Sequence, residues 1–294
     1  MSEIEISILI PTYGRPKQAA ALRAHITGAL PPNYECVIVN QGEVPIESDQ
    51  RSTVINLPVP NLPAARNAAI RASTGEILLF LDDDVVPPPD IAHRHVFMHL
   101  RLDTYAGLAG SISDDNNHGT HAHANDFDSA TLSTEADFCV EKPQNVVWAC
   151  GAHMSFKRSM IGNMLFDPWF TGNANYEDVD FALRLGKRGH KIRYEPYPRV
   201  EHLLETSGGC RLPGSVVASR VSHFRNAAFC YAKNCDLGTI DKFLTKQKND
   251  LEYFSRTDNG RNQQMVVACL VALCKGLILG VVRRTFRGFW PEFM

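Results

Sequence analysis

The residues with the clearest chemical potential are three consecutive aspartates, Asp82, Asp83 and Asp84, which lie between the apolar run EILLFL and three prolines. Three adjacent carboxylates repel one another, so folding alone gives no reason to gather them at the end of a strand. Carboxylate oxygens are ligands that Mg²⁺ and Mn²⁺ prefer, and a divalent cation makes such a cluster favourable. The triplet therefore predicts a Mn²⁺ or Mg²⁺ site, with an acidic turn before the prolines as the structural alternative.

A second pair of carboxylates, Glu177 and Asp178, opens a predicted helix with the sequence YEDVDFALRLGKRGHKI. Acidic residues are stabilised at a helix N-terminus by the helix dipole, so capping is a sufficient structural explanation. The functional interpretation is a general base placed where the helix enters a cleft.

Histidines supply the other candidate metal ligands. His202 follows the short predicted strand RVEH, where an imidazole could complete a metal site or have a purely structural role. His118, His121 and His123 lie in the polar segment 111–145, which lacks flanking regular structure and a fourth ligand. This segment is predicted to be a solvated loop or a lid.

The first hundred residues alternate between strand and helix patterns, which positions these groups. Strands are predicted over IEISILIP, ECVIVN, STVINL and EILLFLDDD, and helices over residues 15–29 and 61–74. Apolar strands that alternate with helices predict a parallel sheet covered on both faces. Because ligands bind beyond the carboxyl ends of such strands, the motifs PTYGR, NQGE and DDD are expected at one functional edge.

The remaining chain is less regular and then helical. The sequence NVVWACGAHMSFKRSMI predicts a strand that leads into a helix, and IRYEP and RVEHL predict two short strands. From Ser215 onward the pattern is helical.

Composition excludes some classes of function. The net charge of −2 gives no electrostatic basis for binding nucleic acid. The eight cysteines show no CxxC or metal-type spacing, and the N-terminal stretch has no basic region with a cleavage site. A cytoplasmic protein with reduced thiols is expected.

Residues 265–282 form an apolar segment with one charge, Lys275. As a helix it would be about 27 Å long, the lower limit for spanning a bilayer. Three alternatives remain: a buried helix, an interfacial helix at the inner membrane face, and a transmembrane span. In the interfacial alternative, the residues that would meet headgroups and the membrane boundary are Arg283, Arg284, Arg287, Phe289 and Trp290.

Together, the ordered motifs ILIPTYGRP, LPAARNAAIRASTGEILLFLDDD, WACGAHMSFKRSMI, FDPWF, YEDVDFALRLGKRGHKIRYEP and VEH resemble the nucleotide-sugar-dependent glycosyltransferases of family 2. The resemblance covers about residues 5–205. It implies an α/β GT-A (Rossmann-like) fold with a mostly parallel sheet flanked by helices. Residues 1–205 would form the catalytic domain, with a nucleotide-sugar-binding half (1–110) and an acceptor-binding half (111–205). Residues 206–294 would be a helical C-terminal extension, whose RNAAFCYAKN resembles members that build surface polysaccharides.

The resemblance also implies roles for individual residues. Asp178 would be the catalytic base, assisted by Glu177, and Asp84 and His202 would bind the metal. The residues implied in donor binding are Pro11, Thr12, Tyr13, Arg15, Asn40, Arg66, Asp82 and Asp83. Those implied in acceptor binding are Trp148, Gly151 and Trp169. The family usually has an aspartate at the position of Asn40, so the identity of the donor base stays open.

The implied activity is metal-dependent, inverting transfer of a sugar from a nucleoside-diphosphate sugar to a hydroxyl of a glycan or lipid-linked acceptor. A peripheral membrane contact through residues 262–290 is expected, no nucleic acid is expected, and a homo-oligomer stays open. One alternative is a sugar nucleotidyltransferase, but PTYGRPKQ has one glycine where that class needs a glycine-rich phosphate loop. The other is a non-catalytic nucleotide-sugar-binding protein, against which Asp84, Asp178 and His202 together argue.

Overall fold

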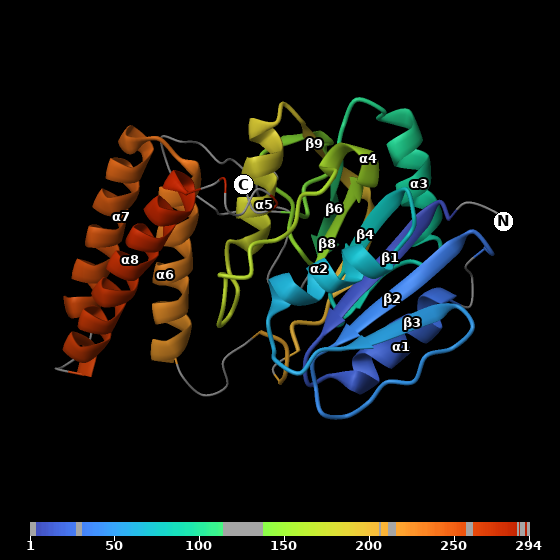
Figure 1. Cartoon of the computed structure of the whole chain (residues 1–294), viewed down its shortest axis with the longest axis horizontal. Helices are drawn as coiled ribbons and strands as arrows, with labels where there is room; N and C mark the ends of the chain where they lie inside the picture. Colours follow the sequence, from blue (N-terminus) through green and yellow to red (C-terminus); the bar gives the residue numbers. More distant parts are fainter. Residues whose placement is uncertain are drawn as a thin grey trace.

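The computed structural model describes residues 4–27, 31–113, 138–205, 207–210, 216–256, 261–286, 288 and 292. These residues form a central sheet with helices on both faces and a group of three helices to one side (Figure 1). His118, His121, His123, Arg287, Phe289 and Trp290 lie outside the described residues.

The N-terminal half alternates strands and helices as predicted. Its elements are β1 (Ile6–Thr12), α1 (Pro16–Thr27), β2 (Tyr34–Asn40), β3 (Ser52–Asn56), α2 (Leu62–Ala72) and β4 (Ile77–Leu81). β1 pairs in parallel with both β2 and β4, and β2 pairs in parallel with β3. Every residue of β1 and β4 is buried, as their unbroken apolar sequences predict. The carboxyl ends of β1, β2 and β4 therefore meet at one edge.

The second half adds both antiparallel and parallel strands to the sheet. Its elements are β5 (Val85–Val86), α3 (Ile91–Arg101), β6 (Gly107–Ser113), β7 (Gln144–Val146), β8 (His153–Lys157), α4 (Arg158–Ile161), α5 (Glu177–Lys187) and β9 (Ile192–His202). Strand β8 pairs antiparallel with β4 and β6, whereas β6 pairs in parallel with β9. The strand order is β3-β2-β1-β4-β8-β6-β9-β5, with β7 pairing β9. The two short strands predicted near residues 192–202 form one strand, β9, with a register shift opposite Gly110 and Ser111.

The short strand β5 lies at the edge of the sheet where β1, β2 and β4 end. It pairs antiparallel with β9, so that Val85 lies opposite His202. This pairing brings the end of β9 beside the aspartates that follow β4.

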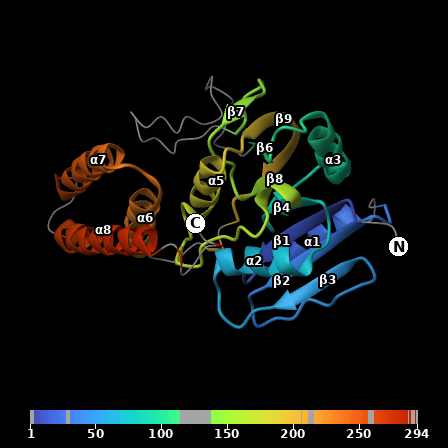
Figure 2. The same cartoon turned by 45° about the horizontal axis from the view of Figure 1, so that its top comes forward.

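Three helices follow the sheet: α6 (Val216–Asn234), α7 (Leu237–Arg256) and α8 (Arg261–Thr285). They lie beside one another next to α5 (Figures 1 and 2). Gly276 of α8 faces α6 so closely that a Cβ there would lie 2.2 Å from the carbonyl oxygen of Arg225. Phe229 and Cys230 of α6 belong to the main hydrophobic core, so the extension packs directly on the sheet region. The domain boundary at residue 205 stays a prediction.

A buried cluster of charges joins the extension to the rest of the protein. Lys233 Nζ of α6 lies 3.0 Å from Asp167 Oδ2 and 2.9 Å from Asp180 Oδ1. Arg283 of α8 donates to Asp167, and Arg184 donates to Asp180. All five side chains are buried. Removing one partner of such a pair leaves a buried charge at a cost of about 3–5 kcal/mol, so this cluster fixes the helices in place.

A separate network of three histidines is buried between α3 and β8. His95 Nδ1 and His99 Nε2 each lie 2.8 Å from the hydroxyl of Ser155, and His95 Nε2 lies 2.9 Å from His153 Nε2. Burial lowers the pKa of His99 to about 3 and the pKa of His153 to about 4. These imidazoles are therefore neutral at neutral pH.

This network predicts a loss of stability in mild acid. Unfolded histidines bind protons below about pH 6.5, whereas the folded ones stay neutral until pH 3–4. Between these limits the unfolded state binds more protons, so the free energy of unfolding falls as pH falls, by up to about 1.4 kcal/mol per pH unit and histidine. Urea unfolding between about pH 7 and pH 5 should show this slope, and His99→Phe should flatten it.

The matched control is His93→Asn, which alters an exposed histidine of the same helix. If the His99→Phe and His93→Asn proteins keep the same slope as the unaltered protein, the network does not cause the acid sensitivity.

Candidate active site

Two adjoining cavities open at the carboxyl edge of the sheet. The first, of about 560 Å³, contains the motifs that end β1, β4 and β9; its walls include Pro11, Thr12, Tyr13, Arg15, Gln41, Asp82, Asp83, Asp84 and His202. The second, of about 320 Å³, is lined by residues that include Arg66, Trp148, Gly151, Glu177 and Asp178. Leu62, Asp82, Asn173 and Asn175 line both cavities. Most of the predicted donor residues line the first cavity, whereas Arg66, Trp148 and Gly151 line the second, and Asp82 lies between the two.

Asp83, the middle aspartate of the triplet, ties the end of β4 to β1. It accepts a hydrogen bond from Thr12 Oγ1 at 2.6 Å and another from Arg15 Nη1 at 2.8 Å. Burial raises the pKa of Asp83 to about 6, while the bonds from Thr12 and Arg15 lower it. Asp83 and Thr12 therefore hold the strand ends together.

Arg15, in the wall of the first cavity, connects the aspartates to the segment that follows β9. Its guanidinium lies 2.9 Å from Asp84 Oδ2 as well as bonding Asp83. It also donates to the backbone carbonyls of Glu205 and Ser207, beyond the end of β9. Arg15 thus anchors the segment after β9 against the aspartates.

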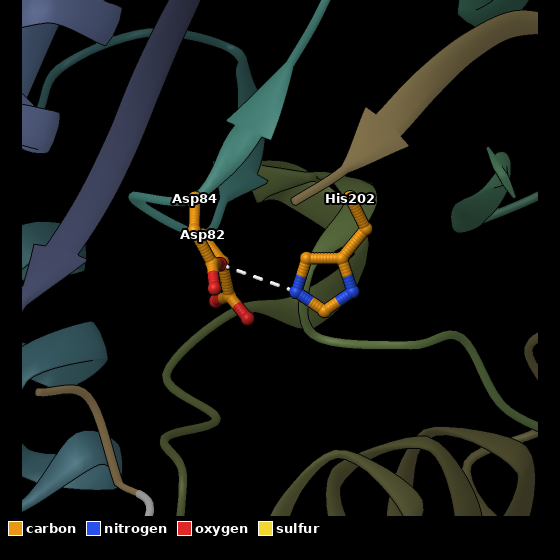
Figure 3. A group of neighbouring side chains, drawn as sticks. All are labelled: Asp82, Asp84 and His202. Carbon is orange, nitrogen blue, oxygen red and sulfur yellow. Dashed lines mark hydrogen bonds and ion pairs between the residues drawn. The ribbon is translucent and has the colours of Figure 1, made fainter. Parts of the chain in front are cut away.

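Asp82, Asp84 and His202 offer ligand atoms that all lie within 4.8 Å of one another. Figure 3 shows the two carboxylates side by side after β4, with the imidazole turned toward them from the end of β9. Asp84 Oδ1 lies 3.2 Å from His202 Nε2, and Asp84 is buried while Asp82 is 31% exposed to the cavity. Two carboxylates and an imidazole are ligand types that would suit a divalent cation such as Mn²⁺.

Arg66 of α2 connects the two cavities. It is buried, and it donates to Asp82 Oδ1 at 3.2 Å and to Glu177 Oε1. A Cβ at Gly151 would lie 2.2 Å from Arg66 Nη2, so only glycine leaves room for the guanidinium there. Within the described residues, Oε2 of Glu177 is buried without a hydrogen-bond partner.

Asp178 is half-buried in the wall of the second cavity. The backbone N–H groups of Gly151 and Val179 donate to its Oδ2 and Oδ1, at 3.0 and 2.8 Å. Burial raises the pKa of Asp178, although the charge of Arg66 and the backbone hydrogen bonds lower it. An oriented carboxylate of raised pKa is suited to accept a proton.

Two predicted residues lie away from the cavities. Asn40 is buried, and its side chain holds the turn after β2 by donating to Val44 O and Asn56 Oδ1, both at 2.9 Å. Its neighbour Gln41 lines the first cavity instead. Trp169 is 47% exposed and lies beside α6 and α8, because Asp167 accepts from its backbone N–H and is itself held by Arg283.

Several cavity residues were not predicted. Asn173 and Asn175 precede the Glu177–Asp178 pair, and Ser219 and His223 come from α6. The available signal was the polar spacing SxxSH within an otherwise apolar helix, since residues three and four apart share a helix face.

Residues 7–164 match the model of glycosyl transferase family 2, which is more than half of the chain. The chain belongs to this family. It is therefore a glycosyltransferase, although the match ends before Asp178 and His202. The comparison with curated proteins gives no match.

Solved structures share the fold. TarS from S. aureus (residues 1–349, in complex with UDP-GlcNAc) superposes with a TM-score of 0.61 at 14% identity, covering 93% of this chain and 81% of that chain. The mannosyltransferase PcManGT from Pyrobaculum calidifontis, in complex with GDP-Man and Mn²⁺, gives 0.53 at 13% identity over 98% and 88%. GalNAc-T7 with UDP, GalNAc and Mn²⁺ gives 0.56 at 14% identity over 97% and 57%. The predicted GT-A fold is confirmed.

The three converging ligands predict Mn²⁺-dependent stabilisation. Because an ion that binds only the folded protein raises its apparent stability, Mn²⁺ should raise the melting temperature of the unaltered protein. His202→Asn and Asp82→Asn should each weaken this effect by about tenfold or more in Mn²⁺ concentration. Asp90→Asn, a surface carboxylate after the prolines, is the control. An equal Mn²⁺ response in all four proteins would contradict the site.

Proposed function

We propose that this glycosyltransferase is metal-dependent and inverting, and that it moves a sugar from a nucleoside-diphosphate sugar to a hydroxyl of a glycan or lipid-linked acceptor. The observation that carries the proposal is the arrangement of the two cavities. The candidate metal ligands face one cavity, the oriented carboxylate of Asp178 faces the other, and Asp82 lines both.

The first cavity suits the nucleotide of the donor. A divalent cation held by Asp82, Asp84 and His202 would stabilise the negative charge that develops on the departing diphosphate. Thr12 and Arg15 hold Asp83 and Asp84 in place through a hydrogen bond and an ion pair. The backbone at Pro11 and Tyr13, with Gln41, would border the nucleobase. The nucleotide-sugar complexes of TarS and PcManGT support this class of donor.

The second cavity suits the acceptor. Asp178 would remove the proton from the acceptor hydroxyl as its oxygen attacks the anomeric carbon and the bond to the diphosphate breaks. A single base and direct attack invert that carbon. Glu177, with one buried oxygen free of protein partners among the described residues, would accept a hydrogen bond from a sugar hydroxyl. Trp148 and Gly151 form the facing wall.

The role of Asp178 predicts a selective loss of chemistry. Asp178→Asn keeps the size of the side chain but removes the base, so transfer should fall by about 10²- to 10⁴-fold. Release of nucleoside diphosphate from a panel of UDP-, GDP- and dTDP-sugars with Mn²⁺ measures the activity. The protein should still bind the donor, as shown by an unchanged thermal shift.

The same base sets the acid limit of activity. Because Asp178 must be ionised and burial raises its pKa above the ordinary 3.8, the rate should fall on acidification at a higher pH than an exposed aspartate allows. Full activity of Asp178→Asn would overturn the assignment of the base, and no release from any donor would overturn the proposed function.

The apolar helix α8 supports a peripheral membrane contact. Its segment Gln264–Thr285 is long and apolar enough to cross a membrane, yet one face packs against the protein and 33% of the most apolar window is buried. The opposite face is exposed, and its apolar residues share one side of the helix: Val267, Leu270, Val271, Ile278, Val281 and Val282. A helix with one packed and one exposed apolar face is suited to lie in the membrane interface.

One part of the interfacial prediction is wrong. Arg283 is buried in its ion pair with Asp167, so it does not face headgroups. Arg284 donates to the carbonyl of Cys235. Arg284 is nevertheless exposed, as is Lys275 beside the apolar face, so these two side chains of α8 would meet anionic lipid.

The exposed face predicts vesicle binding that two surface substitutions abolish. Val271→Glu with Ile278→Glu should remove co-sedimentation with phosphatidylglycerol vesicles while leaving the melting temperature unchanged, since both side chains are exposed. Leu237→Glu, at an exposed leucine of α7, is the control. If the unaltered protein stays in solution and elutes as an oligomer that the double substitution dissociates, the face is a homo-oligomer contact instead.

A further inference from the structure

The helix α6, which belongs to the C-terminal extension, forms part of the active-site wall. Ser219 lines the first cavity and His223 lines the second, beside Asp178. Neither residue lies within the part of the chain that matches the family model, which ends at residue 164.

A single backbone oxygen shows how tightly α6 holds the adjoining loop. The carbonyl oxygen of Thr171 accepts three hydrogen bonds from consecutive turns of α6: from Ser222 Oγ at 3.0 Å, Arg225 Nη2 at 2.7 Å and Asn226 Nδ2 at 3.1 Å. A carbonyl has two lone pairs, so three donors saturate it. Ser222 Oγ also accepts from the backbone N–H of Asn173 at 3.2 Å.

The loop fixed in this way leads directly to the proposed base. Ala174 and Tyr176 have φ values of 54° and 73°, in the left-handed region that residues other than glycine rarely adopt. Tyr176 immediately precedes the Glu177–Asp178 pair, and its ring centroid lies 5.3 Å from that of His223. Contacts from α6 therefore maintain an unfavourable backbone conformation where the loop enters α5.

Two polar side chains in this wall have hydrogen-bonding capacity that the described residues leave unused. Asn173 donates from Nδ2 to Ser219, which leaves its Oδ1 with no hydrogen-bond partner among the described residues. The ring nitrogens of His223 likewise make no hydrogen bond within the described chain, although the ring stacks edge-on against Tyr176. Burial lowers the pKa of His223, so its neutral imidazole offers one donor and one acceptor.

We propose that α6 completes the acceptor side of the active site: His223 and Asn173 bind hydroxyl groups of the acceptor sugar, and Ser222 positions the loop that carries Asn173. This inference rests on the proposed function. A hydroxyl donates one hydrogen bond and accepts others, which matches the acceptor Oδ1 of Asn173 and the two ring nitrogens of His223. The proposed ligand is therefore a neutral, hydroxyl-rich sugar unit.

The test separates acceptor binding from donor chemistry. Nucleoside-diphosphate release by the full chain is measured with the donor that the unaltered protein uses, first with water as acceptor and then with a panel of p-nitrophenyl glycosides. If none of these glycosides is used, a glycan and lipid extract of the host cells serves as the acceptor. His223→Ala should raise the KM for the acceptor by about fivefold to tenfold, as expected for one lost hydrogen bond. Hydrolysis by water and the KM for the donor should not change.

Two further variants make the result specific. His223→Gln keeps a donor and an acceptor and should restore part of the acceptor affinity. Val217→Ala, at an exposed valine of α6 that lines neither cavity, should match the unaltered protein.

Ser222 is tested as a positioning residue. Ser222→Ala removes one donor to Thr171 and the acceptor for Asn173, so it should lower the kcat of transfer by about fivefold or more. Ser222→Thr keeps the hydroxyl and should recover most of that kcat. An equal loss in both variants would indicate a packing role and overturn the positioning role.

The outcomes distinguish the two levels of the proposal. Transfer by the unaltered protein with an acceptor KM that His223→Ala leaves unchanged would overturn this inference and leave the glycosyltransferase mechanism intact. Absence of both hydrolysis and transfer with every donor would overturn the proposed function itself.

Discussion

Mutual repulsion among three carboxylates at the end of β4 is the constraint around which the site is organised. Arg15 forms ion pairs with Asp83 and with one oxygen of Asp84, and Arg66 of α2 forms an ion pair with Asp82. Each arginine also reaches a third element: Arg15 the segment after β9, and Arg66 the start of α5. These ion pairs thus fix the end of β1, the helix α2, the start of α5 and the segment after β9 relative to one another. The charge that remains faces the cavity with His202, where a bound cation would complete the balance.

The sequence predicted the position of a residue well when its partners lie close to it along the chain, and poorly when they lie far away. The parallel strands followed from unbroken apolar runs, and the site edge followed from the polar motifs after them. His202 reaches Asp84 through the two-residue strand β5, which no periodicity reveals, so its placement relied on the family resemblance. Asn40 and Trp169 were expected in the site because of their positions in motifs. The side chain of Asn40 is instead engaged in local hydrogen bonds after β2. Trp169 lies next to the buried charge cluster at Asp167, outside both cavities.

The C-terminal helices were the least predictable part for the same physical reason. Their apolar sequence predicted that these helices bury one face, but it did not predict which element each face packs against. The decisive contacts are between charged residues far apart in the chain: Lys233 with Asp167 and Asp180, and Arg283 with Asp167. In the sequence, Arg283 belongs to a basic tail that suits a membrane surface. In the folded protein Arg283 is buried in its ion pair with Asp167, and the exposed face of α8 is mainly apolar among the described side chains.

These charges join the extension to the segment that carries the proposed base. Asp167 lies at the start of the loop that leads to Asp178, and Asp180 lies in the first turn of the same helix. Without Lys233 and Arg283, both would be buried carboxylates with reduced compensation, which would force the segment 167–180 to rearrange toward solvent. Thr171, between them, is held by three further donors from α6. The family match ends at residue 164, but contacts from residues 216–285 hold the segment that leads to Asp178, so the end of the recognisable sequence motif is not the end of the structure that supports the proposed site.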